Sequence, residues 1–197
     1  MTRKDAILQA ATRLFSMKGF KEASMSELAE MTGVAQGTIF YHFKNKETLF
    51  LSILERIRQD IVERFDQYIK ENSFETGLEM MEGAVSFFLH LAGTIGDEFL
   101  LLHRYDAYEF AEINTTCRAH LEAIYNCLLD IFEGAVLLGQ GDGSIRDLPA
   151  RKTALIIFSM VDGLIRFKTY NLYDAGALYG DLMASCRRIL QNNDGKS

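Results

Sequence analysis

Apolar residues recur at three- and four-residue intervals through nearly every window of this 197-residue chain. That spacing places them on one face of an α-helix, and little of the alternating pattern typical of strands interrupts it. The pattern predicts a first helix from about Arg3 to Lys18, a long one from Lys46 to about Glu71, and two at the end, 150–171 and 175–191. Proline, which breaks helices, occurs once, at Pro149. We therefore expect an all-α fold.

The middle of the chain, from Phe74 to Gly139, carries further apolar stripes of the same kind. Breaks are expected near 93–96, which begins and ends with glycine, and near 113–116. The glycine-rich segment 139–144 predicts a loop, and Pro149 suits the start of the helix that follows. This middle section is expected to contribute three helices.

One stretch near the N-terminus predicts a specific function. A helical pattern over residues 25–32 ends at Gly33, because glycine tolerates the left-handed conformation that closes a helix. A second short helix, about 36–43, follows, and Ser24 with Glu27 forms a capping box that sets where the first begins. Two short helices across a tight, glycine-bearing turn form a helix-turn-helix, whose second helix enters the DNA major groove.

The second of these helices has a composition suited to reading DNA. Its apolar residues can anchor it to a core: Val34, Ile39, Phe40 and Phe43. Its polar residues can hydrogen-bond to DNA, and a glycine among them lets the backbone approach closely. We expect bases to face Gln36, Gly37 and Thr38, and phosphates to be held by Tyr41, His42 and Lys46, with Ser24 acting mainly as a cap. The alternative is a small three-helix core whose polar face is merely solvated.

Residues 19–50 closely resemble the signature of the TetR family of transcriptional regulators. The matching positions are Gly19-Phe20, Ser24-Met25-Ser26-Glu27-Leu28-Ala29, Gly33-Val34, Gly37-Thr38-Ile39, Tyr41-His42-Phe43 and Lys46-Glu47-Thr48-Leu49. Two positions depart from the family pattern. Ala35 replaces the usual capping serine or threonine, and Phe40 replaces the usual tyrosine, so that a phosphate hydrogen bond from that position is lost.

The resemblance implies two domains, a helix-turn-helix DNA-binding domain in residues 1–46 and a helical effector-binding and dimerisation domain in residues 47–197. It also implies a homodimer that binds a pseudo-palindromic operator in double-stranded DNA. Such a protein is expected to be a repressor that a small molecule releases from its operator.

Aromatic residues with a few polar neighbours fill the section from Phe74 to Gly139, as a small-molecule site requires. The expected effector-pocket residues are Phe87, Phe88, Phe99, His103, Tyr105, Tyr108, Tyr125 and Phe132. An ordinary aromatic core is the alternative for any one of them. The two last helices carry more apolar surface than a monomer needs, which favours a two-fold interface. The expected interface residues are Phe158, Leu164, Leu178, Leu182, Cys186 and Ile189.

Charge adds two indications. Residues 1–50 hold seven Lys or Arg against five Asp or Glu, whereas the rest holds fourteen against twenty-two, as suits a DNA reader with an acidic body. Between Phe74 and Glu133 lie eleven acidic residues and only two basic ones. This disfavours a phosphorylated ligand such as an acyl-CoA and favours a lipophilic or aromatic effector, with Glu79, Asp106 or Glu109 available for a cationic one.

Other classes of function find little support. Cys117, Cys127 and Cys186 are scattered, which fits a reduced protein without structural zinc, although a redox-sensing thiol stays an alternative. We expect no metal, no cofactor and no catalytic residues, because no ligand spacing, phosphate loop or nucleophile–base pairing occurs. The chain shows neither a signal peptide nor the ~20 apolar residues of a membrane span, so the cytoplasm is expected and no membrane partner.

Two other functions stay open. One is a DNA-bound scaffold without an effector, whose acidic body docks a protein partner. The other is an enzyme or a lipophile carrier in which the helix-turn-helix is incidental.

Overall fold

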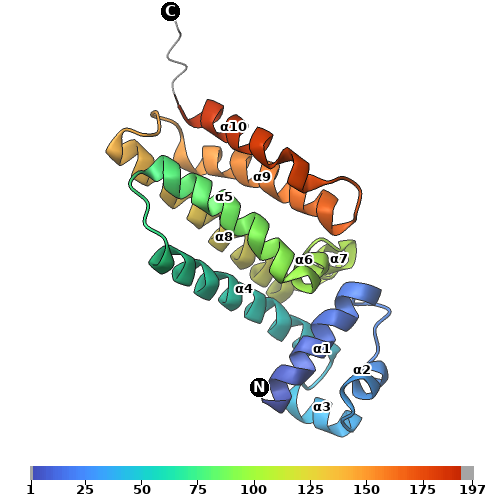
Figure 1. The fold of residues 1–197 in the computed structure, drawn as a ribbon. Helices are drawn as coiled ribbons and strands as arrows, with labels where there is room; N and C mark the ends of the chain where they lie inside the picture. Colours follow the sequence, from blue (N-terminus) through green and yellow to red (C-terminus); the bar gives the residue numbers. More distant parts are fainter. Residues whose placement is uncertain (1, 192–197) are drawn as a thin grey trace, which may run out of the picture. The chain divides into compact units, whose positions relative to one another are not determined.

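The computed structural model describes residues 2–191 of the chain, and all the regular secondary structure there is helical (Figure 1). The all-α expectation is confirmed. The helices are α1 (Arg3–Lys18), α2 (Met25–Thr32), α3 (Gln36–His42), α4 (Lys46–Glu71), α5 (Gly77–Thr94), α6 (Gly96–Leu102), α7 (Tyr105–Ile113), α8 (Thr115–Asp142), α9 (Ala150–Thr169), the 3₁₀ helix η1 (Ala175–Leu178) and α10 (Tyr179–Leu190).

The middle of the chain differs from the prediction in two places. It forms four helices rather than three, because the chain also breaks at His103 and Arg104, the latter in an extended conformation. The predicted loop at 139–144 is also wrong for its first half, since α8 continues to Asp142. Gly139 is needed for packing instead, because a Cβ there would lie 2.5 Å from the side chain of Ile145.

The chain forms two compact units. Unit 1 contains the residues up to Ile61 together with Ile95–Ile124, and unit 2 contains Val62–Thr94 together with the residues from Tyr125 onward. Helix α4 is unbroken and contributes its first part to unit 1 and its last part to unit 2. The expected division into residues 1–46 and 47–197 is one of function and stays a prediction.

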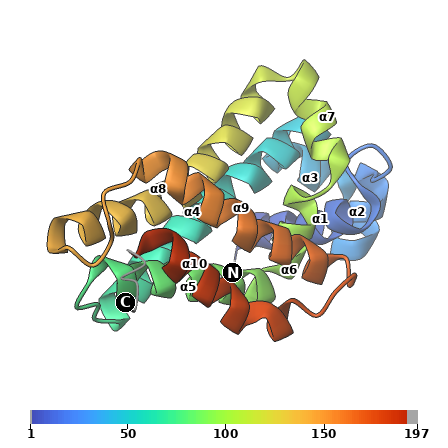
Figure 2. The ribbon, with the colours of Figure 1, turned by 90° about the horizontal axis from the view of Figure 1, so that it is seen from above.

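Unit 1 is built from short helices around a cluster of phenylalanine rings. Helix α1 packs against α2 and α6, and α2 packs against α3 (Figure 2). Phe20, in the loop after α1, stacks on Phe110 of α7 with ring centroids 4.6 Å apart, and it lies 5.0 Å from Phe50 of α4. This cluster ties the helix-turn-helix to α7, which is far away in sequence.

Unit 2 has α5 at its centre. Residues on most sides of α5 are buried, and both α9 and α10 pack against it (Figure 1). Phe88 lies 5.4 Å from Phe158 of α9, and Phe158 lies 5.9 Å from Phe132 of α8. Three helices therefore share one aromatic core.

No single helix among residues 2–191 is long and apolar enough to cross a bilayer. Helices α5 and α6 satisfy the length and composition requirement only when they are taken together across the sharp bend between them.

The start of α5 lies directly against the end of α8. The Gly77 amide donates to the Asp142 carboxylate (2.6 Å). Hydrogen bonds from Ser144 and from this amide lower the pKa of Asp142. A Cβ at Gly77 would overlap the backbone of Gly139, so only glycine fits there.

We predict that Gly77→Ala lowers the free energy of unfolding by about 2–3 kcal/mol, because overpacking at a backbone contact forces a shift. Urea unfolding at a fixed protein concentration measures this. Gly141→Ala is the matched control, because an added Cβ there meets nothing within 4 Å. Gly141→Ala should leave the free energy of unfolding unchanged or raise it by up to about 1 kcal/mol. Equal stability of the two variants would contradict the assigned contact.

Candidate functional site

Local interactions place the two helices of the helix-turn-helix. The Ser24 hydroxyl accepts from the Glu27 amide (3.1 Å), and the Glu27 carboxylate accepts from the Ser24 amide (3.1 Å), so the predicted capping box is present. Gly33 ends α2 in the left-handed conformation with φ of 66°. Ala35 offers no side-chain cap to α3, as expected from its methyl group. The two helices thus begin and end where the sequence predicts.

Two residues hold α3 on the core. Ile39 is completely buried and Phe43, just beyond the helix, is 1% exposed. Phe40, which was expected to join this anchoring set, is instead 42% exposed, and that expectation is wrong. The reason is helical geometry. Residues 39 and 43 are four positions apart and share one face, whereas residue 40 lies about 100° further round.

The rest of α3 presents a polar surface. Gln36 and Gly37 are exposed, Tyr41 is 85% exposed, and Thr38 and His42 are half-buried. The Tyr41 and His42 rings meet edge to face with centroids 5.3 Å apart. A Cβ at Gly37 would meet nothing within 4 Å, so the backbone there is open to a ligand. Five of the residues expected to touch DNA thus lie together on one short helix, whereas Lys46 belongs to α4 and Ser24 caps α2.

The two lysines after α3 differ in their surroundings. The Lys46 ammonium group donates to the carbonyl oxygens of Lys21 (3.1 Å) and Ala23 (3.0 Å). It also lies 4.7 Å from the centre of the Phe20 ring. Lys44 is exposed and forms no ion pair among the residues that the structure describes. Lys46 therefore ties α4 to the loop before α2, while Lys44 is the lysine open to a phosphate.

Helix α7 and the turn before it form hydrogen bonds with the C-terminal end of α1 and the loop after it. The Arg104 guanidinium donates to the carbonyls of Ser16 (3.2 Å) and Met17 (3.4 Å), which α1 leaves unsatisfied at its C-terminus. The Asp106 carboxylate accepts from Arg104 Nε (3.0 Å) and from the Phe20 amide. Gly19 has φ of 88°, and a Cβ there would lie 2.6 Å from Asp106. The helix-turn-helix is therefore fastened to α7 by charge as well as by packing.

These contacts change the interpretation of the acidic charge in the middle section. Asp106 pairs with Arg104, and Glu109 pairs with Lys21 at 2.5 Å. Both carboxylates already have cationic partners within unit 1. They are accordingly less available to a cationic ligand than the sequence indicated.

The expected effector-pocket residues fall into both units. Phe99, His103, Tyr105 and Tyr108 belong to unit 1, where Tyr105 is 74% exposed. Phe88, Tyr125 and Phe132 of unit 2 surround Phe158 and form the buried core described above. Phe87, also of unit 2, lines a hollow.

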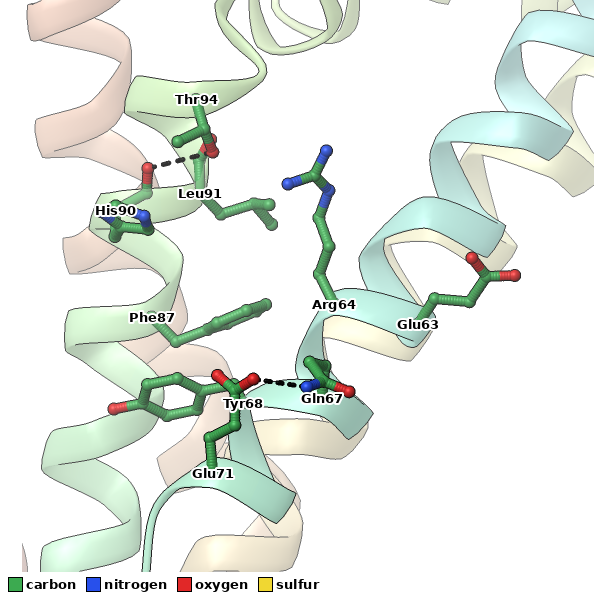
Figure 3. A pocket seen from close by; sticks show the side chains of 9 residues that line it. All are labelled: Glu63, Arg64, Gln67, Tyr68, Glu71, Phe87, His90, Leu91 and Thr94. Carbon is green, nitrogen blue, oxygen red and sulfur yellow. Dashed lines mark hydrogen bonds between the residues drawn. The ribbon is translucent and has the colours of Figure 1, made fainter. Parts of the chain in front are cut away.

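That hollow lies between the last turns of α4 and the facing side of α5, wholly within unit 2 (Figure 3). Its volume is about 380 Å³. Its lining residues are Glu63, Arg64, Gln67, Tyr68, Glu71, Phe87, His90, Leu91 and Thr94. We call it the α4–α5 groove. Phe87 and Leu91 are buried and form an apolar wall, and burial raises the pKa of the Tyr68 hydroxyl, which stays protonated near neutral pH.

The charged residues of the α4–α5 groove point in different directions. The Arg64 side chain extends into the space between the two helices, whereas Glu63 points away from it (Figure 3). Glu71 accepts a hydrogen bond from Gln67. Arg64 forms no ion pair within residues 2–191, so its charge is available to a ligand.

The α4–α5 groove was not predicted from the sequence, because the effector pocket was expected within residues 74–139. The signal was present on both helices. Arg64, Tyr68 and Glu71 recur at four- and three-residue spacing on one face of α4, and Phe87, Leu91 and Thr94 do so on α5. Only the tertiary structure brings those two faces together.

The expected dimer residues also separate into groups. Phe158, Leu182 and Cys186 are at most 6% exposed and pack inside the subunit, so they face its core. Leu164 and Ile189 are half-buried, and Leu178 is 43% exposed. Large apolar side chains are instead exposed elsewhere on α8 and α9: Leu137, Leu138, Leu155, Ile156 and Phe167.

Two of the three cysteines, Cys117 and Cys186, are buried, and Cys127 is half-buried. No group of three or more His, Cys, Asp or Glu residues in the described part of the chain could hold a metal ion. Burial raises the pKa of both Cys117 and Cys186 to about 11, which keeps these thiols protonated and unreactive near neutral pH.

Comparison with known proteins shows what the chain is similar to. The model of the bacterial regulatory proteins of the tetR family matches residues 7–53. The chain is 28% identical to the fatty acid metabolism regulator protein of Bacillus subtilis over 180 residues, which are 90% of each protein. It is 29% identical to the regulator TtgR of Pseudomonas putida over 187 residues, 89% of this chain and 84% of that one.

A solved structure agrees over the whole chain. The transcriptional regulator FadR from Bacillus subtilis, in complex with stearoyl-CoA, superposes with a TM-score of 0.76. It is 26% identical, and the match covers 95% of this chain and 99% of that one. Residues 7–53 thus match the tetR-family model, and the chain is a DNA-binding transcriptional regulator, similar over most of its length to proteins named as regulators rather than as enzymes.

The different surroundings of the two lysines give a prediction for DNA binding. Lys44→Ala should weaken binding to all DNA sequences alike and lower the salt slope of log K by about 1 per subunit in contact, because one phosphate contact is lost. Lys46→Ala should mainly lower the free energy of unfolding, by about 1–2 kcal/mol, because two charge-assisted hydrogen bonds are lost. Salt titrations of DNA binding and thermal melts separate the two effects.

A fall in salt slope for Lys46→Ala with unchanged stability would reverse this assignment. It would show that the Lys46 ammonium group leaves the carbonyls of Lys21 and Ala23 to bind phosphate, as the sequence analysis expected.

Proposed function

We propose that this protein is a homodimeric repressor that binds a pseudo-palindromic operator in cytoplasmic DNA and is released by a small lipophilic effector. The observation that carries the proposal is the surface of α3. Two buried residues anchor that helix, and the residues suited to bases and phosphates are exposed on it. We propose that Gln36, Gly37 and Thr38 face bases, and that Tyr41, His42 and Lys44 hold phosphates.

The exposed apolar residues of α8 and α9 support the homodimer. Leu137 and Ile156 are 55% and 54% exposed, and Leu138 and Leu155 are nearly as open. Large apolar side chains gathered on neighbouring helices mark an interface rather than a solvated surface. A two-fold axis through this face would pair the helices of two subunits, and it requires an operator with matching symmetry.

The α4–α5 groove supports a lipophilic effector. It offers an apolar wall, the ring of Tyr68 and the unpaired guanidinium of Arg64. A similar protein is named a fatty acid metabolism regulator, and the similar FadR structure holds stearoyl-CoA. We therefore propose an effector with a long apolar chain and an anionic group. The acidic section from Phe74 to Glu133, whose charge disfavoured an anionic ligand, does not include Arg64.

The operator is tested by selecting bound fragments from a genomic DNA pool at near-physiological salt. We expect an enriched inverted repeat whose half-sites lie about one helical turn apart or a multiple of it, because two α3 helices must reach the major groove from one face. Weak, salt-sensitive binding without enrichment would contradict the proposal and favour a scaffold or a carrier.

The effector is tested by adding stearoyl-CoA to the complex of the protein with the selected operator. Coenzyme A alone, which lacks the acyl chain, is the control. We expect stearoyl-CoA to release the DNA and coenzyme A not to. Arg64→Gln should raise the concentration needed about tenfold, because a charge-assisted contact worth roughly 1.5 kcal/mol is lost.

Lys70→Gln is the matched variant, since it removes a positive charge from the same helix at an exposed residue that does not line the groove. It should leave release unchanged. If both variants need the same concentration of stearoyl-CoA to release the DNA, the α4–α5 groove is not the effector site.

A further inference from the structure

Phe40 is an apolar ring on the surface that reads DNA. It is 42% exposed, while the neighbouring Ile39 is completely buried. The other exposed aromatic residue of α3, Tyr41, is in ring contact with His42. Phe40 makes no ring contact among the residues that the structure describes. The core of unit 1 therefore leaves much of this ring uncovered.

The position of Phe40 on α3 gives it a defined neighbour. Gln36 and Phe40 are four residues apart, so they lie on the same side of the helix, one turn from each other. Both are exposed. Four residues correspond to about 6 Å along the helix axis, and neighbouring base pairs are about 3.4 Å apart. The two side chains can therefore reach positions within about two base pairs of each other.

The chemistry of phenylalanine limits what it can recognise. Its ring has no hydrogen-bond donor or acceptor, so it cannot read the polar edge of a base or bind a phosphate oxygen. In the major groove thymine alone presents an apolar group, the C5-methyl, which phenylalanine contacts. A tyrosine at this position could hydrogen-bond to phosphate, but a phenylalanine cannot.

Given the operator binding proposed above, we infer that Phe40 is a specificity-determining residue that reads a thymine C5-methyl group within about two base pairs of the base that Gln36 contacts. The ring buries that methyl and excludes water from it. Cytosine at the same position offers no methyl, and its amino group loses hydration against the ring without gaining a partner.

The test removes single methyl groups from the DNA. In a duplex of the selected inverted repeat, each thymine is replaced in turn, in both half-sites, by deoxyuridine, which lacks only the C5-methyl. We expect one thymine in each half-site whose replacement weakens binding by the wild-type protein. Removing one such methyl group should lower the affinity about fourfold, and removing it from both half-sites about fifteenfold. Phe40→Ala should bind the unchanged duplex more weakly and lose nothing more at that position.

Phe40→Leu is the control, because leucine keeps an apolar side chain and should retain part of the methyl sensitivity at the same thymine. A thermal melt and the unchanged response of Phe40→Ala at every other thymine show that the variant is folded. If wild type and Phe40→Ala respond equally at every thymine, the inference fails while operator binding stands. If selection yields no operator, the proposed function fails and the inference with it.

Discussion

The helix-turn-helix depends on the packing of the half-buried Phe20 ring against Phe15, Phe50 and Phe110. Helices α2, α3 and α6 have eight, seven and seven residues, and isolated helices shorter than about 12–15 residues are marginal in water. They persist because they bury apolar side chains in a shared core. The rings that form this core come from the last turn of α1 and the loop after it, from α4 and from α7. The position of the DNA-reading helix is thus set by packing with a segment far along the chain.

Charged contacts reinforce this packing at one end of α1. Arg104 satisfies carbonyls that the helix leaves free, and Asp106 holds both Arg104 and the Phe20 amide. Glycine at position 19 makes room for that carboxylate. The number of acidic residues along the middle of the chain therefore does not give the charge that a ligand would meet. Some of those carboxylates form ion pairs with basic residues, and only the tertiary structure shows which ones.

Helix α4 is common to both halves of the proposed mechanism. Its early turns supply Phe50 to the core under the helix-turn-helix, and its last turns supply Arg64 and Tyr68 to the α4–α5 groove. It runs unbroken between these residues. For an effector to change DNA binding it must bind one conformation of the protein better than another. In the proposed mechanism one continuous helix supplies residues to both the groove and that core.

The amino-acid sequence by itself determined the features that rest on interactions within a few residues. The capping box of Ser24 and Glu27, the helix end at Gly33 and the start of α4 were all predicted, because they depend on neighbours three or four positions apart. The tertiary structure decided which face of each helix is covered. It exposed Phe40, placed Gly139 inside a helix, turned Phe158 inward and brought Arg64 opposite Phe87. Periodicity shows that a helix has an apolar face but not which partner covers it, since that partner is supplied by residues distant in the chain.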